Sequence, residues 1–363
     1  MFTSLSFAFG KMGITAQRCM TNQQINSVVV GAEHDFKFVY YLLRAYEAII
    51  FSFNSGIDTP IVPKSVFESI QVSVPASRIA ERKIAAILSA YDDLIANNQR
   101  RIALLESMAE EIYREWFVRM RFPGHKKAGF VKGVPARWKV LSFREVVEYY
   151  IGGGWGEELP TVSSSEGAFV VRGTDVPKLN GGKLLAGVYR YHSPQNLRSR
   201  RLRDGDFVFE VSGGSKDQLL GRSLLVTDQL LGHFGNEVIC ASFCKLIRFN
   251  AEIASPYFMK YYLKLYYDSG LVGLFQVQST GISNYQFESF LSRQTILIPT
   301  RELRDAFDAQ VQPLVAMKDT LAEQVLALET TRDALLPRLI SGKLKLDHLA
   351  VQFPPSMREK VTA

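Results

Sequence analysis

Residues 84–117 read IAAILSAYDDLIANNQRRIALLESMAEEIYREWF, a stretch that contains neither glycine nor proline. Apolar residues recur through it in alternating steps of four and three, which is the spacing of a heptad seam along one face of a helix. Asn98 is the single strongly polar member of this seam, which otherwise consists of Ile84, Leu88, Tyr91, Ile95, Ile102, Leu105, Ala109, Ile112 and Trp116. At 1.5 Å per residue the helix spans roughly 50 Å, and an apolar stripe of that length predicts a partner helix.

A second heptad pattern lies near the other end of the chain, from Leu303 onward. Residues seven apart are Phe307, Leu314, Leu321, Leu328 and Leu335, and the positions between them are filled by Leu303, Val311, Met317 and Val325. We expect Pro313 to kink or restart this helix, and Pro337 and Gly342 to mark its end. The two patterns predict long helices over 77–121 and 301–346 that pair antiparallel, with a seam that includes Ile95, Asn98, Leu105, Leu321 and Leu328.

The segments before the two helices also repeat. DFKFVYYLLRAY (35–46) aligns with PYFMKYYLKLYY (256–267), so that Tyr40–Tyr41–Leu42 matches Tyr261–Tyr262–Leu263 at an offset of 221 (261 − 40). PIVPKSVFESIQVSVP (60–75) aligns with GISNYQFESFLSRQTILIP (281–299) at nearly the same offset. Such a repeat indicates a duplicated unit, in which a globular domain is followed by a long helix.

The second copy of this unit is predicted to be whole, with its globular domain over 136–300. The same offset leaves the first copy short of roughly 85 residues, so 1–76 are expected to be a remnant of its domain. The opening residues lack the basic and apolar regions of a signal peptide. The remaining parts are a linker over 122–135 and a tail over 347–363.

Local patterns in the second globular domain predict a mixed α and β structure. FVFEV (207–211) and SLLVT (223–227) have the composition of strands, whereas SPYFMKYYLKLYY (255–267) has the periodicity of an amphipathic helix. The predicted fold class is therefore α+β, with two long antiparallel coiled-coil helices and a pseudo-twofold internal duplication.

Composition narrows the classes of protein that fit. The net charge is +7, with 43 Lys and Arg against 36 Asp and Glu, which permits a polyanionic partner such as DNA. No run of 18 apolar residues exists to span a membrane. The cysteines Cys19, Cys240 and Cys244 are too few for a disulfide framework, which suits a cytoplasmic protein, and we expect the last two to be buried rather than to bind a metal.

No catalytic motif is evident. IGGGWGEE (151–158) fails the dinucleotide pattern because Glu157 occupies its last position, and its glycines are better explained as turns. The chain lacks a phosphate-binding loop, a nucleophile elbow, a zinc-protease helix and the Asn/Asp-Pro-Pro-Tyr-like loop of an adenine methyltransferase. We therefore expect a non-catalytic protein that binds no metal and no cofactor of its own.

Several segments in this order resemble the specificity, or DNA-recognition, subunit of type I restriction–modification systems. They are NQQIN (22–26), VPASRIAERKIAAILSAYDDLIANNQRRIALLESMAEEIYREWF (74–117), VVRGTDV (170–176), LRDGDFVFEVSGGSKDQLLGR (202–222) and LLPRLISGKL (335–344). The resemblance covers nearly the whole chain. It implies target recognition domains that each read one half of a split site on double-stranded DNA, separated by an antiparallel coiled coil.

The resemblance also implies partners. These are modification (methyltransferase) subunits, which methylate adenine, and restriction subunits, which translocate and cleave DNA; S-adenosylmethionine, ATP and Mg belong to the partners only. The chain departs from the family pattern because one recognition domain is expected to be a remnant. A truncated or inactive subunit, or a half-subunit that dimerises, is therefore an alternative, and a coiled-coil scaffold or a DNA-modifying enzyme are others.

Contacts with DNA require basic side chains on phosphates and Arg, Lys, Asn or Gln at base edges. Three polar segments of the second domain supply them: NLRSRRLRDGD (196–206), SGGSKDQLLGR (212–222) and QSTGISNYQ (278–286). The predicted DNA-binding residues are Arg198, Arg200, Arg201, Lys216, Gln218 and Arg222, followed by Asn284 and Tyr285. Arg172 and Asp175 of VVRGTDV are equally well explained as a structural turn pair.

Overall fold

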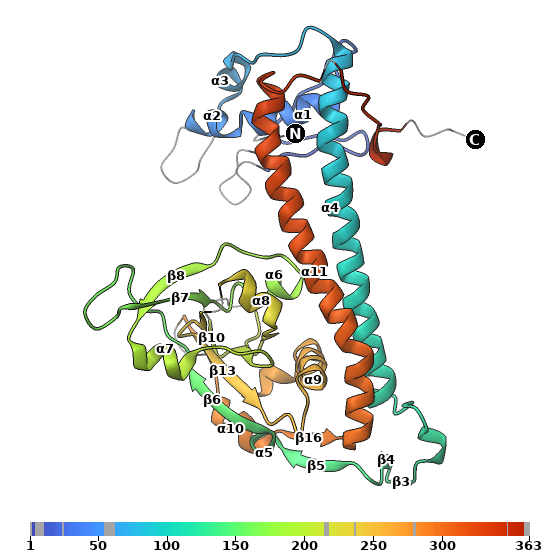
Figure 1. Ribbon diagram of the computed structural model, residues 1–363, viewed down its shortest axis with the longest axis vertical. Coiled ribbons are helices and arrows are strands. Elements are labelled where there is room, and N and C mark those ends of the chain that lie inside the picture. Colours follow the sequence, from blue (N-terminus) through green and yellow to red (C-terminus); the bar gives the residue numbers. More distant parts are fainter. Residues whose placement is uncertain are drawn as a thin grey trace. The chain divides into compact units, whose positions relative to one another are not determined.

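The computed structural model describes residues 2–3, 11–23, 25–53, 62–213, 218–235, 237–278, 281–346 and 348–358. The chain divides into two compact units: a terminal unit, Met1–Asn97 with Val325–Ala363, and a central unit, Asn98–Gln324. Figure 1 labels the two long helices, α4 (Arg78–Tyr113) and α11 (Arg301–Ile340). The division between the units falls within both of them, after Asn97 and after Gln324. Within the described ranges, no helix is both long enough and apolar enough to cross a membrane.

The helices α4 and α11 pack side by side in each unit. In the terminal unit Ile84 of α4 shares a buried cluster with Leu339 of α11, so the start of one helix lies beside the end of the other. In the central unit the rings of Tyr113 and Phe307 lie 5.8 Å apart, which joins the end of α4 to the start of α11. The predicted antiparallel pairing is confirmed.

Burial follows the predicted seam closely, since every member of the α4 series is buried or half-buried. The exposed fraction is 6% for Ile95 and Asn98 and 3% for Leu321, whereas Leu105 and Leu328 are half-buried.

One predicted seam position was wrong. Met317 is 49% exposed, and the neighbouring Lys318 is 5% exposed in its place. The Glu106 carboxylate across the seam pairs with the Lys318 ammonium, and this ion pair offsets the cost of burying the lysine.

The ends of the long helices also differ from the prediction. Helix α11 passes through Pro313 without restarting and ends at Ile340, between Pro337 and Gly342 as predicted, although six residues before the predicted bound of 346. Gly342, with φ +70°, turns the chain back. Helix α4 continues into a π-helical turn over Arg114–Val118, and Met120 follows with φ +58°. Both helices therefore end just before a residue in the left-handed region, which stops further helical hydrogen bonding.

The internal repeat is visible in the short helices α1 (Phe36–Ala45) and α9 (Pro256–Asp268). Asp35 and Ser255 cap them, and each side chain accepts hydrogen bonds from amides of the first turn. Phe38 and Phe258 are fully buried one turn later. These pairs give an offset of 220 (255 − 35), one residue less than the tyrosine alignment suggested, because caps and buried faces rather than residue identity fix the register.

The terminal unit contains a few further short elements. The first part of the chain supplies the paired strands β1 (Phe2–Thr3) and β2 (Ile25–Asn26) and the helices α2 (Glu47–Ser52) and α3 (Lys64–Ser69). The last part supplies a 3₁₀ helix over Pro355–Met357.

The central unit is a mixed α and β domain packed on the helix pair. Its largest sheet is antiparallel, in the order β11 (Ser223–Leu225), β9 (Phe207–Glu210), β13 (Cys244–Phe249) and β6 (Val147–Gly152). In a second sheet β7 (Glu166–Val171) is the central strand. It pairs in parallel with β12 (Val238–Cys240) and antiparallel with β8 (Val188–His192). The strands expected in FVFEV and SLLVT and the helix over 255–267 are confirmed as β9, β11 and α9.

Smaller elements complete this unit. A third sheet has the order β10 (Ser212–Gly213), β15 (Ser283–Tyr285) and β14 (Gln276–Gln278). Two antiparallel pairs join β5 (Lys139–Ser142) to β16 (Thr295–Ile298) and β3 (Phe130–Val131) to β4 (Val134–Pro135). The remaining α-helices are α5 (Phe143–Val146), α6 (Val176–Asn180), α7 (Pro194–Arg200), α8 (Asp228–His233) and α10 (Phe287–Arg293), and two 3₁₀ helices cover His125–Lys127 and Leu271–Phe275.

The four-stranded sheet is buried on both faces. Phe207 and Phe209 of β9 point into the cluster that contains Tyr113 and Phe307 of the long helices. Val208 between them points into a second cluster on the opposite face. This alternation explains why FVFEV is continuously apolar up to its glutamate, and it fixes the sheet against the helix pair.

Candidate nucleic-acid interface

The arginine run lies on α7 and directly after it. Arg198 is exposed and makes no hydrogen bond or ion pair with any residue that the structure describes. Arg201 is half-exposed and forms an ion pair with Glu237 at 2.7 Å. Arg200 donates from Nε to the Gly152 carbonyl at 2.9 Å, so its guanidinium holds the glycine-rich loop. Of the three, Arg198 is the side chain most available to a phosphate.

The groove beside α7 is not a simple anion site. Arg198, Arg201 and Arg203 line it, but so do the carboxylates Glu166, Asp204, Asp228 and Glu237. Since like charges repel, a phosphate is expected to meet Arg198 at the rim rather than inside this groove.

The segment 212–222 is anchored at its end. Arg222 donates from Nε and Nη2 to the Glu210 carboxylate at 2.8 and 2.5 Å, and both side chains are largely buried. These hydrogen bonds raise the pKa of Arg222 above its ordinary value. The Gln218 amide lies against the same guanidinium, and Lys216 lies outside the described residues. Arg222 therefore stabilises the segment from within, and Lys216 keeps its predicted role untested.

The strand pair β10–β15 brings two of the predicted polar segments together. Asn284 lies opposite Ser212, whose Oγ is 3.0 Å from the Asn284 Oδ1, and Asn284 is exposed. Tyr285 is only 6% exposed, and its ring lies 5.3 Å from that of Phe209. Asn284 remains a candidate base contact, whereas Tyr285 has no free face on which a base could stack and is a core residue.

Two motifs noted in the sequence have structural roles. Arg172 donates from Nε and Nη2 to the Asp175 carboxylate at 2.9 and 2.8 Å, which confirms the turn pair. Cys240 and Cys244 are fully buried, and burial raises the pKa of Cys240 to about 12. No group of three or more His, Cys, Asp or Glu side chains in the described ranges is arranged to hold a metal ion.

Trp155, which was not predicted as a binding residue, lies between the glycines of the loop after β6. Its ring is 41% exposed, and the Arg190 guanidinium of β8 lies over it at 5.2 Å from the centroid. Gly153 lies against the backbone of Ala241, too close for any Cβ, so this glycine lets the loop cross the sheet end. An exposed tryptophan with a stacked arginine suits contact with a nucleobase or sugar. The signal was a large aromatic residue within a glycine-rich segment.

A buried ion cluster joins the domain to the helix pair. Lys260 of α9 and Lys318 of α11 both donate to the Glu106 carboxylate of α4, at 2.7 and 3.0 Å. Burial alone raises the pKa of Glu106, but the two ammonium groups outweigh it and hold this pKa at about 2. Burial and the neighbouring Lys318 lower the pKa of Lys260 to about 8.

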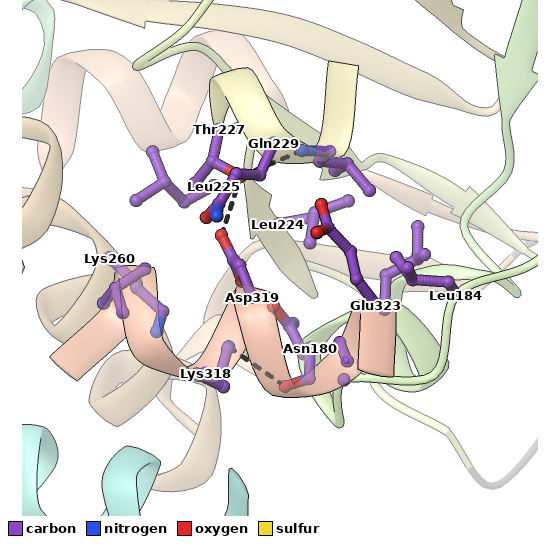
Figure 2. Close-up of a pocket in the computed structure, with 15 residues that line it drawn as sticks. Asn180, Leu184, Leu224, Leu225, Thr227, Gln229, Lys260, Lys318, Asp319 and Glu323 are labelled. Atoms are coloured by element: carbon purple, nitrogen blue, oxygen red, sulfur yellow. Dashed lines mark hydrogen bonds between the residues drawn. The ribbon is translucent and has the colours of Figure 1, made fainter. Parts of the chain in front are cut away.

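Figure 2 shows the small cavity next to this cluster. Lys318 reaches the Asn180 carbonyl at 3.3 Å, and Thr227 donates to the Asp319 carboxylate at 2.9 Å across the cavity. Its volume is only about 40 Å³, which is room for a water molecule and far below that of a nucleotide-sized site. These residues therefore dock α6 and α8 onto α11.

Comparisons with known proteins find similarity to specificity subunits of type I restriction enzymes. A family model described as the Type I restriction modification DNA specificity domain matches residues 3–107. The chain is 22% identical over 355 residues to the type I restriction enzyme MjaIX specificity subunit of Methanocaldococcus jannaschii, covering 94% of this chain and 76% of the relative. The MjaVIII specificity subunit of the same organism is 28% identical over 145 residues, which are 39% of this chain and 32% of that one. The crystal structure of a type I S subunit from M. genitalium superposes with a TM-score of 0.50 and 13% identity, covering 85% of this chain and 73% of that chain, and supports the fold.

Proposed function

The chain is related over most of its length to specificity subunits of type I restriction–modification systems, and we propose that it recognises DNA sequence for such a system. The observation that carries this proposal is the duplicated unit of short helices and one long helix, with the two long helices paired antiparallel. A duplicated protein suits a DNA site made of two half-sequences.

Residues 136–300 act as a target recognition domain in this proposal. Arg198 contacts a phosphate, Asn284 and Lys216 contact base edges, and Trp155 packs on the nucleic acid. The chain transfers no methyl group and cleaves no bond itself. It directs partner subunits that methylate adenine with S-adenosylmethionine and that cleave DNA with ATP and Mg.

The test is to co-express the chain with its modification subunit and to map methylated adenines across the genome. The expected result is methylation at one split sequence, which changes when 136–300 are exchanged for the corresponding domain of a relative. Methylation that is absent, or that ignores the exchange, would refute the proposal. Purified chain with S-adenosylmethionine and duplex DNA serves as the control and should show no turnover.

A coiled-coil scaffold unrelated to DNA is the competing function. It predicts that binding to duplex DNA is absent or independent of salt, whereas phosphate contacts make the affinity fall steeply with salt concentration. Fluorescence anisotropy with random and genomic duplexes at two salt concentrations separates the two.

A further inference from the structure

The net positive charge of the chain is concentrated in one segment of the central unit. Residues 116–144 carry eight Lys and Arg and neither Asp nor Glu. Their charge of +8 exceeds the +7 of the whole chain, so the other residues together carry −1 (7 − 8). The eight are Arg119, Arg121, Lys126, Lys127, Lys132, Arg137, Lys139 and Arg144. Such segregation indicates a polyanionic partner for this segment in particular.

Most of these basic side chains have no acidic partner in the fold. Arg119, Arg121 and Arg144 pair with glutamates of α4, of the π-helical turn or of α10. The other five are exposed and form no ion pair with any residue that the structure describes. We call these five the hairpin cations: Lys126, Lys127, Lys132, Arg137 and Lys139. Their charge is therefore available to a partner outside the chain.

The segment that carries the hairpin cations is held in place at both ends. Phe122 and Trp138 are buried, and their rings lie 5.4 Å apart. Between them the chain forms the 3₁₀ turn over His125–Lys127 and the β3–β4 hairpin. The hairpin is closed by the Ala136 amide, which donates to the Gly129 carbonyl at 2.8 Å. Because the backbone is already ordered, binding through this segment costs little conformational entropy of the chain.

Lys132 occupies a position that disfavours a lysine. It forms the two-residue turn between β3 and β4 together with Gly133, and their φ angles are +50° and +80°. Turns with positive φ at both central residues favour Asn-Gly or Gly-Gly, because most other side chains are strained in this conformation. A strained lysine at the exposed tip of a hairpin indicates that its ammonium group has a function.

The composition of the segment favours contact with phosphates over contact with bases. Residues 116–144 contain no Asn or Gln, the side chains that read adenine, and four of the five hairpin cations are lysines. A lysine acts on a phosphate as a point charge without base preference. Figure 1 shows β3 and β4 beside the end of α4 and well apart from α7, which carries Arg198. The hairpin cations and Arg198 therefore meet different phosphates.

We propose that the hairpin cations bind the phosphate backbone of duplex DNA beside the recognised half-site, independently of base sequence. This inference rests on the proposed function and adds to it a contact that supplies affinity without specificity. Each phosphate that a lysine neutralises releases counterions, so the contact weakens as the salt concentration rises. An acidic protein surface is the competing partner.

The test uses the chain co-purified with its modification subunit, and a variant that carries Lys126→Gln, Lys127→Gln and Lys132→Gln. Fluorescence anisotropy at several salt concentrations measures binding to a random duplex and to a duplex that holds the methylated sequence. The affinity of the variant should fall at least about tenfold for both duplexes, and the salt slope should flatten by about two to three units. The ratio of the two affinities should stay unchanged, because no base contact is lost.

The matched control removes the same charge from exposed positions of α4, through Arg78→Gln, Arg100→Gln and Arg101→Gln. Because distant exposed charges are screened by salt, this control should bind as the parent does. Equal binding by the hairpin variant and the parent would overturn this inference and leave the proposed function intact, whereas a parent that binds neither duplex would overturn both. Loss of the modification subunit at unchanged DNA affinity would overturn it too, and would assign the hairpin cations to an acidic protein.

A single substitution separates binding from folding at the hairpin tip. Asparagine tolerates positive φ better than lysine does, so Lys132→Asn should raise the melting temperature by about 1–2 °C. The same variant should bind the random duplex several-fold more weakly, since one phosphate contact is lost. A higher melting temperature with unchanged affinity would show that the strained lysine serves no contact with DNA and would overturn its role.

Discussion

Lys318 of α11 donates a hydrogen bond from Nζ to the Glu106 carboxylate of α4 over 3.0 Å, and the lysine side chain is only 6% exposed. Lys260 of α9 shares the same carboxylate. Three helices of the central unit therefore meet at one buried carboxylate. Removal of one partner from such a cluster leaves charge unpaired in a poorly solvated place.

We expect Lys318→Met to lower the free energy of unfolding by about 3 kcal/mol, since Glu106 then loses one of its two cations. Lys126→Met, which removes an exposed lysine, should change it by less than about 0.5 kcal/mol. Urea titration followed by tryptophan fluorescence measures both. Equal stability of the two variants would show that the cluster does not hold the helices.

The pH dependence of stability should carry the signature of Glu106. Its pKa is about 2 in the folded protein, below the ordinary value of 4.5. The stability it contributes is complete above pH 4.5 and is lost as pH falls towards 2. In Lys318→Met this loss between pH 4.5 and 2 should be smaller, because the folded pKa moves back towards its ordinary value. Urea titrations at pH 5 and 3.5 test this, and parallel acid limbs would contradict it.

The helix seam predicts a contrast between two residues of α11. Leu321→Ala should cost about 2–5 kcal/mol, because a large buried side chain is replaced by a cavity. Met317→Ala, four residues earlier and on the exposed face, should cost less than about 0.5 kcal/mol. Thermal unfolding of both variants measures this contrast. A large loss of stability in Met317→Ala would place Met317 in the seam.

Arg198 should act through phosphate. Arg198→Ala is expected to weaken binding to all duplexes alike and to reduce the salt slope by about one unit. Arg222→Met is the contrasting variant, since it leaves Glu210 unpaired and should lower the melting temperature instead. A loss confined to one DNA sequence on Arg198→Ala would move that residue to the base-reading class.

Asn284 should act through a base. Asn284→Ala is expected to relax one position of the recognised sequence and to cost about 1–3 kcal/mol on the cognate duplex alone. We expect the same kind of effect from Lys216→Ala. Competition with single-substituted duplexes measures the effect, and equal losses on cognate and random DNA would place either residue on the backbone.

Local sequence patterns predicted the helices and strands whose buried residues recur at a regular spacing. The seam from Ile84 to Trp116, the strand in FVFEV and the helix around Tyr261 all follow from periodicity, because a period of 3.6 or 2 directly reports the buried face. The residue that shares the seam with Leu321 was misjudged. Apolarity favours Met317, but Lys318 is buried because a carboxylate from a distant helix meets it.

The same difference between residue type and tertiary contact applies to the predicted DNA-binding residues. Residue type selected Arg198, Arg200, Arg201 and Arg222 as equals, since all four carry the same charge. Their partners separate them: Glu210 and the Gly152 carbonyl occupy two of the guanidinium groups, Glu237 pairs with a third, and Arg198 is left exposed. Trp155 was overlooked because exposure of an aromatic ring is a property of the folded loop.

The sequence by itself determined the duplicated plan, the two long helices and the apolar faces along which they pair, because these depend on spacing within one segment. Only the tertiary structure decided which polar groups are free and which are already paired. Met317 and Lys318 illustrate the difference, because apolarity favours the first for the helix seam, whereas the Glu106 carboxylate of α4 pairs with the second and buries it. Which side chain meets such a partner depends on a helix far away in the chain, and no local pattern records that contact.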